Sequence, residues 1–375
     1  MLKKFAAQIF KYTSKKIDIL LTKDTIYLLS AQITPEQVQD VQHRLEFYAP
    51  GKKLEVRKCL SWQIALSSCP ILVMGLSENM RHLKRFRGGV FDIDPDLNPK
   101  ASSQYCKLAG YCAETKIDNA EARRRFRSYV EILRKQQLKK AYIFGTGPSL
   151  AEAIDQDWSD GYRIVCNTIV RDPELWRHIN PHFIVAGDAL YHFSYTQFAR
   201  AFRADLALRL AESQTFFVYP AIFHEIVIRE LAEFSDRLIP IPTGVDTKIS
   251  VDLTQEFSLP RMGNVLPRLL LPLACSMSKD VFLWGFDGRA PNDRLFWSNS
   301  AKHNYPELMP ELQEAFPAFF SYYVPDENPQ KYVASVHGET LENELQAAEE
   351  AGWSFTMLHE SWTPTLQRRY RPLER

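Results

Sequence analysis

The chain has 375 residues, of which 45% are hydrophobic and 24% are charged. This length suits two domains of ordinary size, and this composition excludes an intrinsically disordered chain, which carries too few apolar residues to build a core. The 46 basic and 45 acidic residues give a net charge of +1, which excludes a general electrostatic attraction to nucleic acid. We therefore expect a folded protein of two domains with no nucleic-acid partner.

Residues 1–16 carry five lysines and no acid, interleaved with apolar residues at near-helical spacing. A basic amphipathic helix of this kind can lie on an anionic membrane surface, so this segment is a candidate peripheral membrane contact, with packing on its own domain as the alternative. The six cysteines form no CxxC pair and no zinc-like spacing, and no apolar signal peptide precedes them. We expect reduced thiols in a cytoplasmic protein, with the inner face of the membrane as the place of any membrane contact.

Short apolar runs alternate with helical segments in the first 137 residues. The expected strands are residues 25–29, 53–56, 70–74 and 89–93, with an expected helix at 35–47. Such alternation is typical of a largely parallel α/β unit. The sequence therefore predicts a smaller N-terminal α/β domain over residues 1–137.

A strongly basic helix is expected over residues 119–140, at the end of this first domain. Its apolar stripe consists of Ala122, Phe126, Val130 and Leu133. The basic side chains lie elsewhere on the helix: Arg123, Arg124, Arg125, Arg127, Arg134 and Lys135. Because no aromatic stacking platform accompanies them, we interpret them as a solvated face of a connecting helix and not as a nucleic-acid site.

The second domain is expected over residues 138–375. Its predicted strands are largely apolar runs at residues 140–144, 163–166, 182–186, 215–219 and 280–284. Runs of this kind suit parallel strands that are covered on both faces. We predict a Rossmann-like, largely parallel sheet with helices on both faces. The proline-rich residues 306–329 are interpreted as a surface loop or lid with a short helix in it.

The loop at residues 145–149 follows the first strand of this domain and contains Gly145, Thr146, Gly147 and Ser149. The glycines allow a sharp turn and the close approach of a ligand, and Pro148 suits the first helical position, so that unpaired helix amides face the turn. The loop is therefore predicted to hold a nucleotide's phosphate. The dinucleotide fingerprint would need a glycine where Leu150 stands, and the Walker motif is absent. A turn that merely needs glycine is the alternative.

A family resemblance rests on the order of several motifs. Gly-x-Gly-Pro-Ser-Leu after a strand, followed by a strand ending in Cys166-Asn167, resembles the bacterial lipooligosaccharide sialyltransferases. The resemblance continues through Gly187-Asp188, Gly263-Asn264-Val265, Gly285-Phe286-Asp287 and a segment ending in His337, and it covers most of residues 140–362. The first motif is also similar to 6-hydroxymethylpterin diphosphokinase-like proteins and motility accessory factors.

The resemblance implies a single-Rossmann glycosyltransferase-like fold and the inverting transfer of a sialic acid-like or Kdo-like sugar. The donor would be CMP-activated or carry another nucleotide, and the acceptor would be a surface glycan. Nucleotide binding falls to Gly145, Thr146, Gly147, Ser149, Asn167, Gly263, Gly285 and Asp287. The general base falls to His337, since an imidazole can take a proton at cellular pH.

Two departures from the family pattern open alternatives. Asp188 stands where the family has asparagine, so it is a second candidate catalytic residue that would hold ribose hydroxyls or magnesium, or else cap a turn. The family's tyrosines after Gly-x-Asp are missing, and Arg289 or Arg294 would neutralise the leaving phosphate instead.

No cofactor is expected, because the nucleotide-sugar is a substrate, and magnesium is possible but not expected. The segment from Asp92 to Asp96 resembles an acidic metal motif but is interpreted as an acidic turn. The histidines at positions 192, 224, 303 and 359 are interpreted as structural. A diphosphokinase-like enzyme and a non-catalytic nucleotide-fold scaffold are the alternatives to a glycosyltransferase.

Overall fold

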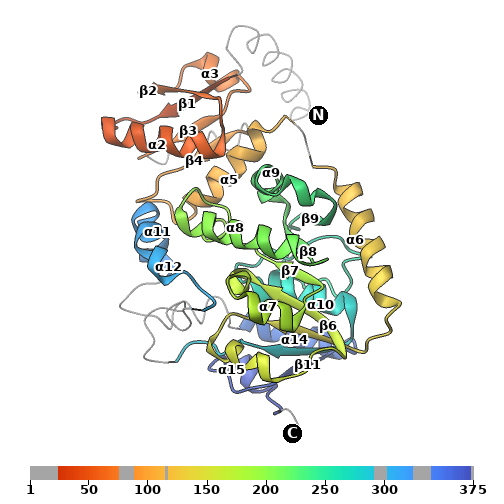
Figure 1. Ribbon diagram of the computed structural model, residues 1–375. Helices are drawn as coiled ribbons and strands as arrows, with labels where there is room; N and C mark the ends of the chain where they lie inside the picture. The colour runs from red at the N-terminus through yellow and green to blue at the C-terminus, as the bar shows by residue number, and fades with distance from the viewer. Residues whose placement is uncertain (1–23, 76–87, 115–116, 291–301, 324–338, 373–375) are drawn as a thin grey trace. The chain divides into compact units, whose positions relative to one another are not determined.

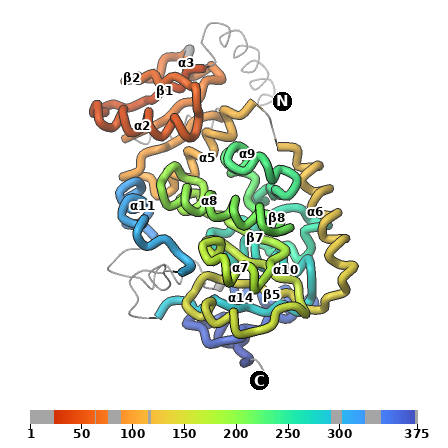
Figure 2. Tube along the Cα trace, viewed as in Figure 1, coloured from red at the N-terminus to blue at the C-terminus, as the bar shows by residue number. Residues whose placement is uncertain are grey.

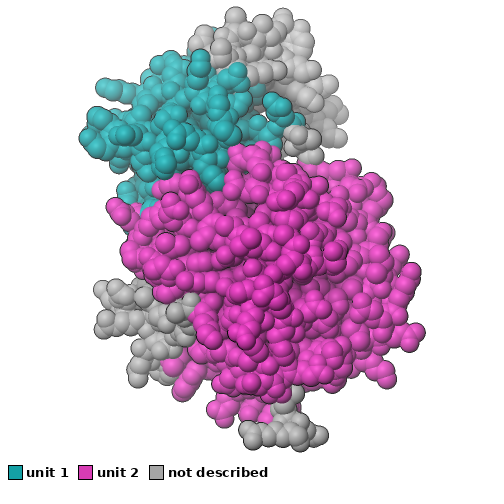
Figure 3. Space-filling model, viewed as in Figure 1, with its two compact units in different colours: residues 1–116, 315–322 teal, residues 117–314, 323–375 magenta. Residues whose placement is uncertain are grey.

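The computed structural model describes residues 24–75, 88–114, 117–290, 302–323 and 339–372. Two compact units are present (Figure 3): unit 1 comprises residues 1–116 and 315–322, and unit 2 comprises residues 117–314 and 323–375. The chain therefore leaves unit 1, returns to it for one short segment, and leaves it again, as the colours in Figure 2 allow the reader to follow.

Unit 1 contains a parallel four-stranded sheet in the order β2-β1-β3-β4. The strands are β1 (Thr25–Leu29), β2 (Lys53–Arg57), β3 (Ile71–Val73) and β4 (Val90–Asp92), and the helices are α2 (Pro35–Tyr48), α3 (Trp62–Leu66), α5 (Ala101–Cys112) and α12 (Pro317–Tyr323). Thr34 and Gln37 form a capping box that fixes the start of α2. The prediction of a small parallel α/β unit is confirmed.

The returning segment at residues 315–322 is held in unit 1 by Arg44. This buried guanidinium donates to the carbonyl oxygen of Ala315 at 3.1 Å, and its Cζ lies 5.0 Å from the ring centre of Phe316. Asp40 accepts from Arg44 Nε at 2.7 Å, which compensates the buried charge. The expectation of a surface loop at residues 306–329 is wrong for its described part, because η8 (Pro306–Leu308), α11 (Met309–Ala315) and α12 are helical and Phe316 is buried.

The acidic segment after β4 forms a turn. The Asp94 carboxylate accepts hydrogen bonds from the backbone N–H groups of Gly75, Asp96 and Leu97, at 2.9 to 3.1 Å. Three amide donors satisfy this carboxylate within the turn itself, as the acidic-turn interpretation expects. Within the described ranges, no three His, Cys, Asp or Glu side chains cluster in a way that could hold a metal ion.

Unit 2 contains a parallel seven-stranded sheet in the order β11-β10-β5-β6-β7-β8-β9. Its strands are β5 (Lys140–Phe144), β6 (Gly161–Cys166), β7 (Phe183–Val185), β8 (Phe216–Pro220), β9 (Leu238–Ile241), β10 (Asp280–Trp284) and β11 (Ser354–Met357). The chain builds outward from β5 to β9 and then returns to the other side of β5 for β10 and β11. The connections after β5 and β10 therefore run in opposite directions, so these two strands flank the topological switch point, where open α/β sheets bind ligands.

Helices cover both faces of this sheet, as predicted (Figure 1). Alternate strand residues such as Ala141 and Ile143 share a core with Phe126, Leu273 and Leu345. These last three residues belong to α6 (Asn119–Arg134), α10 (Leu271–Met277) and α14 (Glu339–Glu350), which therefore line one face. Figure 1 shows α7 (Pro173–Ile179) and α8 (Gln197–Ala211) over the opposite face, and α9 (His224–Glu230), α15 (Pro364–Gln367) and short helical turns complete the unit.

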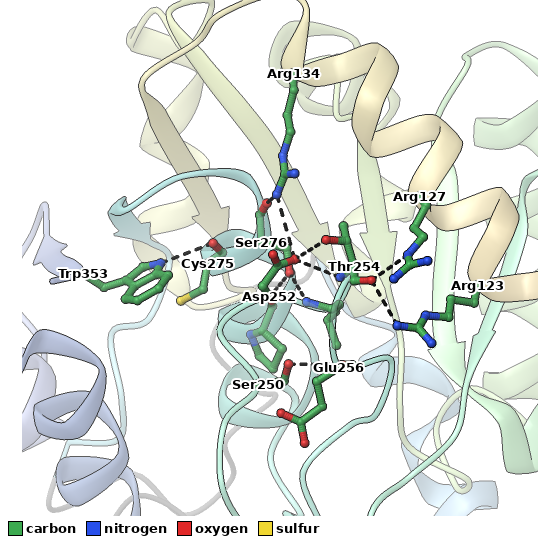
Figure 4. A network of polar contacts seen from close by, with 12 residues as sticks. Arg123, Arg127, Arg134, Ser250, Asp252, Thr254, Glu256, Cys275, Ser276 and Trp353 are labelled. Carbon is green, nitrogen blue, oxygen red and sulfur yellow. Dashed lines mark hydrogen bonds and ion pairs between the residues drawn. The ribbon is translucent and has the colours of Figure 1, made fainter. Parts of the chain in front are cut away.

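Helix α6 belongs to unit 2, whereas the sequence analysis assigned it to the N-terminal domain. Its apolar stripe is buried as expected, but four of its arginines do not face solvent alone. Arg123 donates to Gln255 O at 2.5 Å, Arg127 to Thr254 O at 2.6 Å, Arg134 to Ser276 O at 2.7 Å and Arg125 to Leu238 O at 2.9 Å. Figure 4 shows Arg123, Arg127 and Arg134 extending from α6 toward Thr254 and Ser276. The expectation of a solvated face is incomplete for these four arginines, because backbone carbonyls of the loop at residues 254–255, of α10 and of β9 accept hydrogen bonds from them.

Replacing Arg127 with methionine is expected to lower the free energy of unfolding by about 1 kcal/mol, since a hydrogen bond from a charged donor to Thr254 O is lost while the aliphatic stem remains. Arg124→Met is the matched control, because the side chain of Arg124 is mostly exposed and, in the described part of the chain, pairs with Glu121 on the same helix. Urea unfolding of both variants checks the difference. Equal losses would show that the carbonyl contact contributes nothing.

All six cysteines are free thiols in the structure. Among the described residues, no helix is both long and apolar enough to span a bilayer. The basic segment at residues 1–16 lies outside the described residues.

Candidate functional site

Two loops meet at the switch point of unit 2: the glycine loop (residues 145–149) after β5 and the aspartate loop (residues 285–288) after β10. The Gly145 amide donates to Trp284 O at 2.7 Å, and the Gly147 amide donates to Gly285 O at 2.9 Å. A β-carbon on Gly145 or on Gly285 would overlap the carbonyl of the other residue, and Gly285 has a φ of +78°. Both glycines are therefore required by the backbone contact between the loops.

The carboxylate of Asp287 lies beside the backbone amide of Ser149, at the end of the glycine loop. It accepts from the Ser149 amide at 3.2 and 3.3 Å and from the Ser149 hydroxyl at 2.9 Å. Ser149 lies in the first turn of a 3₁₀ helix, η2 (Pro148–Asp155), whose N-terminus attracts an anion as expected. Here that anion is the chain's own carboxylate. A phosphate at the position predicted from the sequence would have to displace Asp287 from Ser149.

His359, which lies after β11, also belongs to this network of hydrogen bonds. It follows β11 by two residues, and its Nε2 accepts from the Gly285 amide at 2.8 Å. Its Nδ1 lies 2.8 Å from Glu360 O, which can only accept, so the imidazole is in the neutral Nδ1–H form. The Ser149 hydroxyl lies 2.7 Å from the same Nε2. The sequence analysis treated His359 as structural, although a polar residue just after a parallel strand is a signal for the carboxyl edge of the sheet.

Asn167 lies at the same carboxyl edge, directly after β6. It adopts a left-handed backbone conformation with a φ of +52°, which asparagine tolerates better than most residues. Its side-chain oxygen Oδ1 is buried and has no hydrogen-bond partner among the described residues. Buried acceptors are almost always satisfied, so this oxygen is a candidate contact for a hydrogen-bond donor of a ligand.

Asp188 follows β7 and caps a turn. Its carboxylate accepts from the amides of Leu190 at 2.8 Å and Tyr191 at 3.3 Å. Burial raises the pKa of Asp188, while these two amides and the charge of Arg268 act in the opposite direction. These contacts correspond to the cap that the sequence analysis gave as the alternative to a catalytic role.

The remaining predicted residues differ in what surrounds them. Gly263 has no heavy atom within 4 Å of the place where a β-carbon would stand, so the fold does not require glycine there. Thr146 is partly exposed and makes no hydrogen bond within the described part of the chain. Arg289 is buried, with only 6% of its surface exposed. Arg294 and His337 lie outside the described residues.

Comparisons with known proteins identify no family for this chain. No protein-family model matches the chain, and no curated protein matches it. Among solved structures, the sialyltransferase CstII from Campylobacter jejuni, in complex with the substrate analogue CMP-3FNeuAc, aligns with 14% sequence identity and a TM-score of 0.34. The alignment covers 61% of this chain and 88% of that chain. A likeness this weak supports no conclusion, and the fold class stands on the strand order described above.

Proposed function

We propose that the chain is a glycosyltransferase whose unit 2 binds a nucleotide-sugar donor at the carboxyl edge of the seven-stranded sheet. The proposal rests on Oδ1 of Asn167, a buried oxygen next to the switch point between β5 and β10 that has no hydrogen-bond partner among the described residues. An unsatisfied buried acceptor costs roughly 1–3 kcal/mol. A donor group of the nucleotide, such as an exocyclic amine or a ribose hydroxyl, would remove that cost on binding.

The contacts of Asp287 favour a particular placement of the nucleotide. The Asp287 carboxylate already accepts a hydrogen bond from the Ser149 amide. It can therefore accept hydrogen bonds from the ribose hydroxyls more readily than it can lie beside a phosphate, as acidic residues do in other doubly wound folds. The amide and hydroxyl of Thr146, which make no hydrogen bond to any residue that the structure describes, are then the donors of the glycine loop that remain for a phosphate oxygen. The glycine loop therefore contributes through Thr146 in this proposal, and Ser149 holds Asp287 in place.

The family resemblance in the sequence supports the finer features of the proposal. The donor is a CMP-linked sialic acid-like or Kdo-like sugar, the acceptor is a surface glycan, and no metal is needed. His337 acts as the general base, and Arg289 and Arg294 neutralise the leaving phosphate. Each of these assignments depends on the order of the motifs along the chain.

A non-catalytic nucleotide-fold scaffold is the second candidate function. It is favoured by the closed network of Ser149, Asp287 and His359, in which each side chain already has a partner inside the protein. Calorimetric titration of the full chain with CMP, UDP, GDP and ATP, the last with and without magnesium, separates the possibilities. We expect CMP to bind. Binding of ATP with magnesium alone would indicate a diphosphokinase, and binding of no nucleotide would support the scaffold.

Asn167→Gly is expected to weaken nucleotide binding about tenfold, which corresponds to about 1.4 kcal/mol, and to leave the thermal midpoint unchanged or higher. Glycine removes the amide but adopts the left-handed conformation without strain. Asn180→Gly is a matched control: Asn180 also has a positive φ, of 47°, but it ends α7 before the start of β7. Titration of both variants with CMP checks the prediction. Equal affinities would remove Asn167 from the site.

A further inference from the structure

Trp362 is a large aromatic residue that the fold leaves exposed between two buried neighbours. Its relative exposure is 61%, whereas Ser361 and Thr363 are 8% and 2% exposed. A tryptophan side chain contributes one of the largest apolar areas available to a core. The exposed indole of Trp362 is therefore accessible to a ligand.

The backbone around Trp362 is attached directly to the aspartate loop. The Trp362 amide donates to Asp287 O at 2.7 Å, and the Ser361 hydroxyl donates to Phe286 O at 2.6 Å. Gly288 has a φ of +75°, and a β-carbon there would lie 2.7 Å from Thr363 Oγ1 and 2.8 Å from its nitrogen. The aspartate loop is thus in backbone contact with the glycine loop on one side and with residues 361–363 on the other.

Further hydrogen bonds fix the backbone on which the indole stands. The Ser361 amide donates to the side chain of Gln367 at 2.7 Å, and the Thr363 amide donates to Ser361 Oγ at 3.2 Å. Thr363 then leads into α15, whose last residue, Gln367, donates its amide to Thr363 O at 2.9 Å. An aromatic side chain on a backbone held this way loses little conformational entropy when a ligand contacts it.

We propose that Trp362 is the stacking platform for the nucleobase of the donor. This inference rests on the proposed function, in which Asp287 takes the ribose hydroxyls. The base is joined to that ribose by a single bond, and Trp362 is hydrogen-bonded to Asp287 through its own backbone. Every base has a π face that an indole can cover, so stacking at this position binds the base without requiring a particular pattern of hydrogen bonds.

Three variants of the full chain test the assignment by calorimetric titration with CMP. Trp362→Ala is expected to lower the affinity about tenfold, and Trp362→Phe to stay within about threefold of the wild type, because phenylalanine retains an aromatic face. Trp62→Ala is the matched control: Trp62 is 66% exposed and lies in unit 1. Its affinity for CMP should equal that of the wild type.

The possible failures are distinguishable. If the wild type binds no nucleotide, the proposed function fails and the assignment of Trp362 fails with it. If the wild type binds CMP and Trp362→Ala binds it equally well, the proposed function stands and the stacking role is wrong. The stacking role is also wrong if Trp362→Phe binds CMP as weakly as Trp362→Ala does. It is wrong as well if Trp362→Ala lowers the affinity for a CMP-sugar but not for CMP, because the sugar would then lie on the indole.

Discussion

Replacing Gly285 with alanine is expected to lower the free energy of unfolding of unit 2 by roughly 2–5 kcal/mol and to abolish nucleotide binding. A β-carbon at a φ of +78° costs about 1–2 kcal/mol. The same carbon overlaps the Gly145 carbonyl, and an overpacked contact of this kind costs a further 1–3 kcal/mol or so. Because the contact joins the glycine loop to the aspartate loop, its loss separates Asp287 from Ser149.

Gly51→Ala provides the matched control for this experiment. Gly51 has the same φ of +78° but no heavy atom within 4 Å of the position of a β-carbon. Its replacement should therefore cost only the backbone term, about 1–2 kcal/mol, and should leave CMP binding unchanged. Urea unfolding followed by tryptophan fluorescence, with CMP titration in parallel, measures both effects. Equal destabilisation by the two substitutions would contradict a close contact between the loops.

The strands beside the switch point were predictable because their sequences are unambiguous. β5 and β10 were predicted to the residue, since each is a charged residue followed by four apolar residues and ends at a glycine. β9 was not predicted, because Pro240 interrupts a run of four residues and prolines in short segments suggest a loop. The proline is tolerated here because β9 is the edge strand of the sheet.

Helix α8 shows why a pattern of apolar residues can fail inside a core. Arg203 and Arg209 interrupt its apolar positions, and yet both are buried. Arg203 donates to the carbonyl oxygens of His192 and Ser194, each at 2.9 Å. These acceptors come from the loop before the helix, and their position depends on the finished fold. The hydrophobic pattern alone therefore could not identify this helix.

The sequence predicted the individual loops of the site but not the hydrogen bonds between them. Strand-end motifs identified the glycine loop, Asn167 and the aspartate loop, because parallel strands place their carboxyl ends at one edge of the sheet. The hydrogen bonding of a carboxylate to a helix N-terminus 138 residues earlier along the chain has no local signature. For this reason, the sequence analysis assigned the Ser149 amide to a ligand's phosphate, whereas the structure assigns it to Asp287.

Acidification from pH 7.5 to pH 5.5 is expected to destabilise unit 2 through its buried histidines. Burial, assisted by the charge of Arg163, lowers the pKa of His182 to about 4, and burial, assisted by the charge of Arg203, lowers that of His192 to about 3. Both imidazoles accept hydrogen bonds through Nδ1, from the amides of Arg163 at 3.0 Å and Asp188 at 3.2 Å. The folded state therefore holds both rings in the neutral form.

The sign of the effect follows from proton uptake on unfolding. In the unfolded chain these histidines titrate near 6.5, so below that pH the unfolded state binds protons that the folded state does not. The stabilisation is complete above about pH 6.5 and is lost as the pH falls toward the folded-state values. At pH 5.5 each histidine accounts for a loss of about 1.4 kcal/mol, or about 3 kcal/mol for the pair.

Asparagine substitutions isolate this contribution from other groups that titrate in the same range. Asparagine retains an acceptor near the position of Nδ1 but takes up no proton, so His182→Asn and His192→Asn should each reduce the difference in unfolding free energy between pH 7.5 and pH 5.5 by about 1.4 kcal/mol. His178→Asn is the control in the same unit, because His178 is exposed in the folded protein. Asp188 titrates in the opposite sense, since its pKa is raised, but it is common to all variants and cancels in the comparison. Urea unfolding at the two pH values measures each difference. A pH dependence that is the same in the wild type and in both buried-site variants would show that these histidines take up no proton on unfolding.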